Sequence, residues 1–451
     1  MLKLTESAIS YSWAVSLFGV QQLVNLVTPV DLRDPTRKLN AASYAITQST
    51  QAQFNDLIFG GFQIGQQIER SLVDLVFDTL TCRAFTPDYV SKLTADIVAQ
   101  SQDTLQVFTS TENARLAWLE LKNNYEVFNL VKNVSSLLNI PSEGKDFELR
   151  ELIAKAYALG EYPDLWAVEG LGHDYAMTFF PLWGKGQPVR GMLTDERASV
   201  LPEKSLTMMH AGIGLAFAQQ LMDRITPYSP GSEIRGVLQE FVTLVRNNSR
   251  KGYEGAAYES LGLVTRFWHS QMVNIVDQTL SEVEPETVGY FWHGVGRGHY
   301  FLPIYFVPGL LSPWLAIEHE APHELAQLNM IAGLAWAMTI VNVRQPKIME
   351  NFLKYHGDRV ARTPAFSNGV MSTLIMGIDI TPSDVYITSF LQYRPDPSDP
   401  RVVELWNNLV GGPANDAVQR IYPVLKKHHC LGEVFRYNDL RGLAERLESS
   451  R

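Results

Sequence analysis

The sequence predicts an all-α protein, and three observations lead to that prediction. Apolar residues recur at helical spacing along the 451 residues, whereas the alternation typical of strands is scarce. Prolines gather between the apolar segments, for example at 227–230 and at 303–313. A glycine-centred segment recurs about every 40 residues, which is the length of one helical hairpin repeat. We therefore expect a helical bundle built from repeated helical hairpins.

Three regions follow from this pattern. Residues 1–141 are expected to form an N-terminal helical region, in which a polar stretch at Pro29–Pro35 precedes a helix over residues 41–80. A repeated-helix core is expected over residues 142–380, because the glycine-centred segments all lie there. The remainder, residues 381–451, is expected to be a C-terminal helical tail.

The composition restricts the partners and the compartment. A net charge of −10 predicts no nucleic-acid partner, since phosphate binding needs a basic face. The two cysteines, Cys82 and Cys430, exclude a disulfide-stapled scaffold and fit a reducing cytosol. Polar residues interrupt the apolar stretch Ala8–Val27, which favours a buried or interfacial helix over a membrane span. We expect a cytoplasmic protein that is not integral to a membrane.

The glycine-centred segments resemble one another over residues 168–176, 210–218, 253–258, 293–300 and 331–337. Their second small residues are 42, 43, 39 and 37 positions apart, at Gly172, Gly214, Ala257, Gly296 and Gly333. Because glycine lacks a Cβ, two helix backbones can approach closely at such positions. A dinucleotide fingerprint would instead need a strand before the glycines, and the flanking residues favour helix on both sides.

Acids and imidazoles stand beside these glycines. Charged side chains are rarely fully buried unless they are paired or bound to a metal. Several such ligands converging inside a helical bundle are typical of a carboxylate-bridged dimetal site. The candidate metal ligands are Glu169, His173, His210, Glu254, Glu259, His293 and His299.

Each candidate also has a structural interpretation. A lone histidine is more often a hydrogen-bonded core or surface residue than a ligand, and the helix dipole favours acids such as Glu169 and Glu254 at helix starts. Neighbouring layers of a linear solenoid are about 10 Å apart. These two acids, two repeats apart, could therefore share a metal only if the helices close into a bundle or a tight ring. The metal hypothesis is thus also a prediction about architecture.

Other catalytic patterns carry less information. The segment His319-Glu-Ala-Pro-His323 has the letters of a zinc-protease helix, but Pro322 would break the helix that places both histidines on one face. The pair Glu320-x-x-His323 meets the same objection, and we expect a new helix to open at His323. The sequence contains no Gly-x-Ser-x-Gly elbow, phosphate loop or Cys-x-x-Cys pair.

Two resemblances arise from these segments. The stretch Tyr253-Glu-Gly-Ala-Ala and the repeated Gly-x-Gly helices resemble uncharacterised helical proteins encoded in enediyne biosynthesis clusters, over residues 160–345. This similarity implies a natural-product context. Separately, the segment Trp166-Ala-Val-Glu-Gly-Leu-Gly-His173, the glutamine-rich helix at 47–80 and the chain length are similar to cyanobacterial dimetal-carboxylate halogenases of the cylindrocyclophane type. Those enzymes are understood to chlorinate unactivated carbons of fatty acyl chains on an acyl carrier protein.

The second resemblance implies a mechanism. Glu169 and Glu254 would be catalytic and bridge two iron ions, with O2 and chloride as cosubstrates and an acyl carrier protein or fatty acyl substrate as partner. The remaining ligands would be His173, His210, Glu259, His293 and His299. An acidic carrier would need a basic patch, to which Arg297 or Lys426-Lys427 could contribute. The chain lacks an unbroken Asp/Glu-x-x-His pair, which such enzymes usually show twice.

Two other functions remain open on the same residues. One is a non-catalytic helical-repeat binding or scaffold protein, in which the glycines and acids are architectural. The other is a hydroxylase or desaturase on the same metal site. A homo-oligomer is compatible with each of the three.

Overall fold

The computed structural model describes residues 111–140, 148–180, 189–301 and 320–450, together with residues 314 and 317. Leu119–Leu302 and Glu320–Arg451 form one compact unit, which holds all seven candidate ligands. The features expected within residues 1–110, including the helix at 41–80 and Cys82, lie outside the described residues. The domain boundaries after residues 141 and 380 stay predictions.

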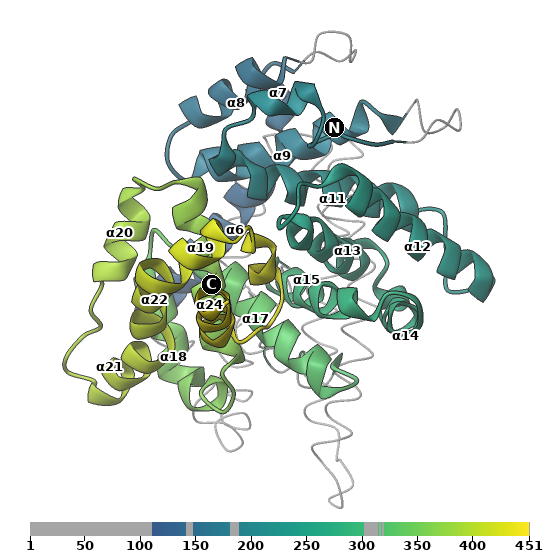
Figure 1. The fold of residues 1–451 in the computed structure, drawn as a ribbon. Helices are drawn as coiled ribbons and strands as arrows, with labels where there is room; N and C mark the ends of the chain where they lie inside the picture. Colours follow the sequence, from purple (N-terminus) through teal and green to yellow (C-terminus); the bar gives the residue numbers. More distant parts are fainter. Residues whose placement is uncertain are drawn as a thin grey trace, which may run out of the picture. The chain divides into compact units, whose positions relative to one another are not determined.

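The predicted all-α fold is confirmed, because every regular element in the described ranges is a helix (Figure 1). Each glycine-centred segment lies in one of a series of core helices: α9 (Pro163–Met177), α11 (Leu206–Met222), α13 (Glu254–Trp268), α15 (Val288–Phe301), α17 (Glu324–Val341) and α19 (Ala365–Ile380). Helices that precede this series are α6 (Thr111–Lys132), α7 (Val134–Leu137) and α8 (Leu149–Ala158).

Further helices connect and follow the series. Those that lie between its members are α12 (Gly231–Asn248), α14 (Val273–Val283) and α18 (Pro346–Val360), with the short η2 (Glu196–Val200) and η3 (Glu203–Ser205) before α11. The C-terminal part contains α20 (Val385–Gln392), α21 (Pro400–Trp406), α22 (Gly412–Asp416), α23 (Tyr422–Lys427), η9 (Leu431–Phe435) and α24 (Leu440–Ser449). Two π-helical turns flank α22, at Asn407–Gly411 and Ala417–Ile421.

The core helices pack in chain order, each against the next, and glycines form the contacts. A Cβ added to Gly212 of α11 would lie 2.1 Å from the carbonyl oxygen of Glu169 in α9. One added to Gly294 of α15 would lie 2.0 Å from the carbonyl oxygen of Glu259 in α13. Real Cβ atoms do not approach backbone so closely, so these helices require glycine there. The prediction that the glycines allow close backbone approach is confirmed; the repeat period itself remains a prediction.

Helices α13 and α15 run in the same direction, since Tyr258 lies beside Tyr290 near their starts and Arg266 lies beside Gly298 near their ends, and α15 and α17 do so too. Helices α15 and α17 meet near their starts, where Gly289 lies beside Asn329. They meet again near their ends, where Asn342 donates a hydrogen bond of 2.6 Å to the hydroxyl of Tyr300. We call this series of parallel, glycine-packed helices the helix row.

The row also brings together helices that are not neighbours. The start of α9 contacts the end of α17, and the start of α11 contacts the end of α19. The hydroxyl of Tyr162, just before α9, donates to the carbonyl of Val341 at the end of α17, at 3.0 Å. Thr207 at the start of α11 donates to Asp379 at the end of α19, at 3.3 Å. Since neighbours are parallel, these end-to-start contacts indicate that the direction of the helices changes along the row. This twist brings side chains of helices that are not neighbours together.

The connecting helices cover the row with one apolar face each. Helix α12 buries a stripe that includes Ile234, Leu238, Phe241 and Val245, while its other face is exposed. Such a stripe is typical of an amphipathic surface helix. By contrast, nearly all residues of α11 are buried. The helix row is therefore the core of the unit.

Helix α17 is the one helix in the described ranges that is long and apolar enough to cross a membrane, judged by length and composition alone. Most of it, 78% of the apolar window, is buried inside the structure. A single helix of this kind is weak evidence, since the core helix of a soluble protein passes the same test.

Candidate functional site

Four buried side chains meet at the centre of the helix row. Arg297 donates from Nη2 to Glu169, at 2.9 Å, and from Nη1 to Glu259, at 3.0 Å. His293 Nδ1 lies 3.0 Å from the other oxygen of Glu259. We call Glu169, Glu259, His293 and Arg297 the central ion network. Each is at most 2% exposed.

The network keeps its charges inside the protein by pairing them. Burial by itself raises the pKa of Glu259, but Arg297 and His293 outweigh it, so that this pKa lies below its usual value. Burial likewise opposes the charge on Arg297, yet Glu169 and Glu259 raise its pKa above the usual value. The guanidinium also lies over the ring of Trp336, 4.6 Å from the ring centre. The charged forms of Glu259 and Arg297 are therefore the stable ones at neutral pH.

The twist of the helix row explains why these residues meet. Glu169 comes from α9, Glu259 from α13, and His293 and Arg297 from α15. Glu169 and Arg297 are 128 positions apart in the chain. In a straight row α9 and α15 would be separated by α11 and α13, whereas the turning helices let the long arginine side chain reach across.

The other four candidate ligands lie elsewhere, each with its own partner. His173 is partly exposed, and its ring nitrogens contact Asp174 and Gln219. Glu254 accepts a hydrogen bond of 2.6 Å from the backbone N–H of Gly252, in the turn before α13.

Buried His210 is held by backbone on both sides. Its Nδ1 donates to the carbonyl of Leu206 at 2.6 Å, and its Nε2 accepts from the N–H of Arg250 at 2.9 Å. Its ring stacks on Tyr253, with ring centres 5.3 Å apart. Burial lowers the pKa of His210 to about 4, so this imidazole is neutral at pH 7.

His299 belongs to a second buried ion network. Its Nε2 lies 2.8 Å from Glu320, and Arg266 donates to the other oxygen of Glu320 at 3.0 Å. Burial would raise the pKa of Glu320, but Arg266 and His299 hold it at about 2. His323, which the sequence pairs with Glu320 at metal-motif spacing, instead caps α17 and contacts Asp277. The expectation that a helix opens there is confirmed; His319 lies outside the described residues.

The structure therefore joins three of the seven candidates, Glu169, Glu259 and His293, and it places an arginine among them. In the described ranges no group of three or more His, Cys, Asp or Glu side chains is arranged to hold a metal ion. Glu254, which was expected to bridge metals with Glu169, takes no part in the central ion network.

The sequence offered Arg297, or alternatively Lys426-Lys427, as a contributor to a basic surface patch; Arg297 is only 2% exposed and therefore does not lie on the surface. A signal for its true position was available. Arg297 lies four residues after His293, on the same face of an otherwise apolar, glycine-rich helix. A charge in such a helix needs a buried partner.

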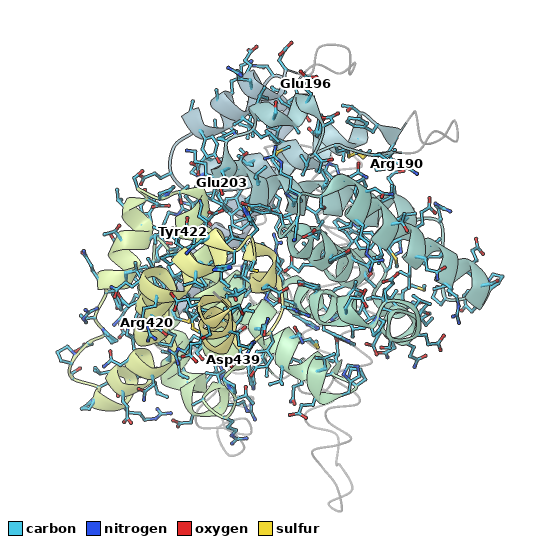
Figure 2. All side chains as sticks on the ribbon, in the orientation of Figure 1. Arg190, Glu196, Glu203, Arg420, Tyr422 and Asp439 are labelled. Atoms are coloured by element: carbon cyan, nitrogen blue, oxygen red, sulfur yellow. The ribbon has the colours of Figure 1, made fainter. Side chains whose placement is uncertain are left out.

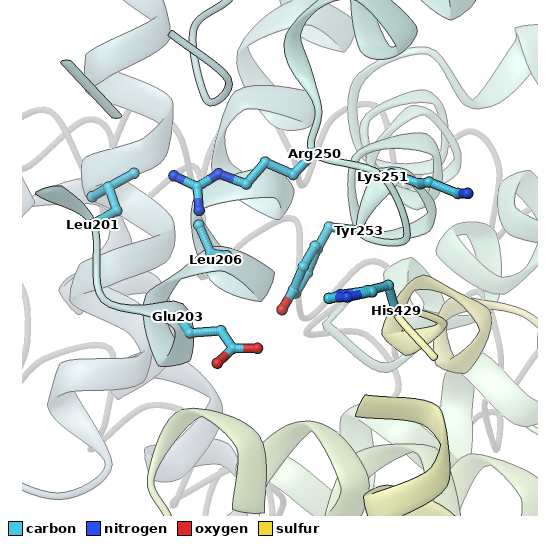
Figure 3. Close-up of a pocket in the computed structure, with 7 residues that line it drawn as sticks. All are labelled: Leu201, Glu203, Leu206, Arg250, Lys251, Tyr253 and His429. Carbon is cyan, nitrogen blue, oxygen red and sulfur yellow. The ribbon is translucent and has the colours of Figure 1, made fainter. Parts of the chain in front are cut away.

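A pocket of about 490 Å³ lies apart from the central ion network (Figure 3). Three segments form it: the end of η2 with η3 and the start of α11, the turn before α13, and the loop between α23 and η9. Its lining residues are Leu201, Glu203, Leu206, Arg250, Lys251, Tyr253 and His429. We call it the Tyr253 pocket.

Close backbone packing fixes the turn that carries Arg250 and Tyr253. Gly252 has a φ of +88°, and a Cβ there would lie 1.8 Å from the carbonyl oxygen of His429. Only glycine fits such a position. The turn is therefore held against the loop after α23 on one side and against His210 on the other.

Beside the pocket, the C-terminal part of the chain contributes a further ion pair. Lys426 of α23 donates to Asp379 of α19 at 2.8 Å, and the hydroxyl of Tyr422 donates to the same oxygen at 3.1 Å. Figure 2 labels Tyr422 of α23, and also Glu203 of η3, which lines the pocket. Burial, and then the negative charge of Asp379, raise the pKa of Tyr253 to about 12. The tyrosine thus keeps its proton as a hydrogen-bond donor.

Comparison of the chain with protein-family models, with curated proteins and with solved structures gives no match. The resemblances to enediyne-cluster proteins and to dimetal halogenases therefore stay predictions.

Proposed function

We propose that this protein is a non-catalytic helical-repeat binding protein, in which the buried acids and imidazoles hold the helix row together. One observation carries the proposal. Arg297 donates to both Glu169 and Glu259, so a permanent positive charge occupies the place between the carboxylates where a bridging cation would have to lie.

Electrostatics makes this arrangement hard to exchange for a metal. A cation that took both carboxylates would leave the guanidinium of Arg297 buried and without its partners. Breaking a buried ion pair in this way costs about 3–5 kcal/mol. Moreover, a divalent ion beside the guanidinium would meet repulsion at a distance that water does not screen.

The metal content of the purified chain tests the proposal. Protein produced with iron supplied is expected to contain well below one equivalent of iron, manganese or zinc by elemental analysis. Glu169→Gln and Glu259→Gln are expected to leave that content unchanged. Glu282→Gln, a charge-matched change at an exposed position of α14, serves as the control.

The same measurement tests the alternative functions, which are a fatty-acyl halogenase and a hydroxylase or desaturase on the same metal site. Near two equivalents of iron, lost on Glu169→Gln and retained in Glu282→Gln, would overturn the proposal. Product masses from a carrier-bound acyl chain, with chloride supplied or withheld, would then separate halogenation from hydroxylation.

A further inference from the structure

Arg250 presents a rigid cation to the Tyr253 pocket. Its Nε donates to the carbonyl of Leu193 and its Nη2 to that of Ala198, both at 2.7 Å. These bonds fix the guanidinium and leave Nη1 without a backbone acceptor. In the described part of the chain, no carboxylate pairs with Arg250. The side chain lines the pocket (Figure 3), and Nη1 is the nitrogen that it can offer to a ligand there.

Tyr253 supplies a second donor on the same space. The residue is only 5% exposed, because its ring is stacked on His210. Its hydroxyl points into the pocket (Figure 3) and has no hydrogen-bond partner within the described ranges. The hydroxyl faces the open space of the pocket at the end of a fixed ring, so it is placed to donate to an acceptor that enters that space.

The remaining walls describe the rest of the ligand. Leu201 and Leu206, both buried, give the pocket an apolar surface beside the guanidinium (Figure 3). The carboxylate of Glu203 lies on the opposite side from Arg250 and adds one negative charge. Arg250 and Lys251 give the lining two formal positive charges against the one negative charge of Glu203, so a ligand with a single negative charge, such as a carboxylate, balances it. Two donors also match the two oxygens of a carboxylate.

We propose that the Tyr253 pocket binds a small organic carboxylate, whose oxygens accept hydrogen bonds from Arg250 Nη1 and the Tyr253 hydroxyl and whose apolar body lies on Leu201 and Leu206. The inference deepens the proposed binding function and rests on it. A volume of about 490 Å³ falls within the range usual for small-molecule pockets.

Calorimetric titration of the full chain with benzoate tests the chemistry of the ligand. Benzyl alcohol has the same body without the charge, and inorganic phosphate is an anion without the body. We expect benzoate to bind at least about ten-fold more tightly than either, since a charged acceptor gains most from the two donors. Equal binding of benzoate and benzyl alcohol would overturn the proposal, as would tighter binding of phosphate.

Two variants with opposite expected effects test the site. Tyr253→Phe removes the hydroxyl and keeps the stacked ring, and it should weaken benzoate binding about ten-fold. Glu203→Gln removes the competing negative charge and should strengthen binding about three-fold. Glu282→Gln makes the same charge change far along the chain and should alter nothing.

Unchanged affinity in Tyr253→Phe would contradict the proposal, and so would weaker binding in Glu203→Gln. Circular dichroism of each variant confirms that it is folded. The iron content of the same preparation reports on the proposed function independently. If the protein is metal-free and does not bind benzoate, only the ligand assignment is overturned. If it contains near two equivalents of iron, the proposed function is overturned.

Discussion

At the centre of the helix row, Arg297 donates both terminal nitrogens to carboxylates, whereas beside the pocket Arg250 donates to backbone carbonyls and keeps one nitrogen unused. The two histidines differ in the opposite sense, because both ring nitrogens of His210 have backbone partners, whereas His293 Nε2 has no partner in the described ranges. His293 contacts the carboxylate of Glu259, while His210 lies between two backbone groups and is neutral. At the centre the charged groups pair with one another, although His293 Nε2 and Arg297 Nε are buried there without a partner in the described ranges; at the pocket, Arg250 and Tyr253 line open space. The difference therefore lies in what the arginines face: two carboxylates at the centre, and a cavity of about 490 Å³ beside Arg250.

The largest expected effect comes from removing the central cation. Arg297→Met keeps the volume but leaves Glu169 and Glu259 buried without their partner, and it should destabilise the fold by about 3–5 kcal/mol. Urea unfolding followed by circular dichroism measures the change. The triple variant with Glu169→Gln and Glu259→Gln should recover most of the loss. A loss of less than about 1 kcal/mol for Arg297→Met would show that the network does not hold the row together.

Glycine contacts give the next largest effect. Gly294→Ala places a methyl group against the carbonyl of Glu259 and should destabilise by about 2–3 kcal/mol, because backbone rather than a flexible side chain must move. The matched change Gly236→Ala lies on the exposed face of α12, where a Cβ meets nothing within 4 Å. It should stabilise the protein by about 0.5–1 kcal/mol. Equal effects of the two changes in urea unfolding would refute the close-approach explanation.

Because His210 is neutral in the folded protein, the free energy of unfolding depends on pH. The pKa is about 4 in the folded protein against a usual value of 6.5, so the unfolded chain takes up its proton first as pH falls. The resulting stability is fully present above pH 6.5 and is lost as pH falls towards 4. His210→Gln should flatten this decline by about 2 kcal/mol between those pH values. Chemical unfolding at a series of pH values measures the slope; identical slopes in both proteins would contradict the prediction.

The smallest expected effect on stability is that of Tyr253→Phe, and Tyr300→Phe is the matched comparison. Tyr253→Phe removes a hydroxyl that has no partner in the described ranges and should change stability by less than about 0.5 kcal/mol. Tyr300→Phe removes a hydroxyl that donates to Glu120 and accepts from Asn342, and it should destabilise by about 1–2 kcal/mol. Thermal or urea unfolding of both variants provides the test. A larger loss for Tyr253→Phe would mean that its hydroxyl has a structural role.

The candidate site could be anticipated only in part. Glu169, Glu259 and His293 stood out in the sequence because charged groups in apolar helices need partners. Position relative to the glycine did not identify which of them meet. Glu254 and His293 each precede the first glycine of their segment, yet one caps a turn and the other joins the centre. The pocket had no sequence signature, since its lining comes from three separate segments.

The sequence by itself determined the all-α fold and the close packing at the glycines, because helical periodicity and the absence of a Cβ act locally along the chain. Only the tertiary structure decided which charges neutralise one another. Glu169 meets Arg297 across 128 residues because the helices of the row turn as they pack, and no local pattern encodes that crossing. The same crossing placed an arginine, rather than a fourth acid or imidazole, between the two carboxylates.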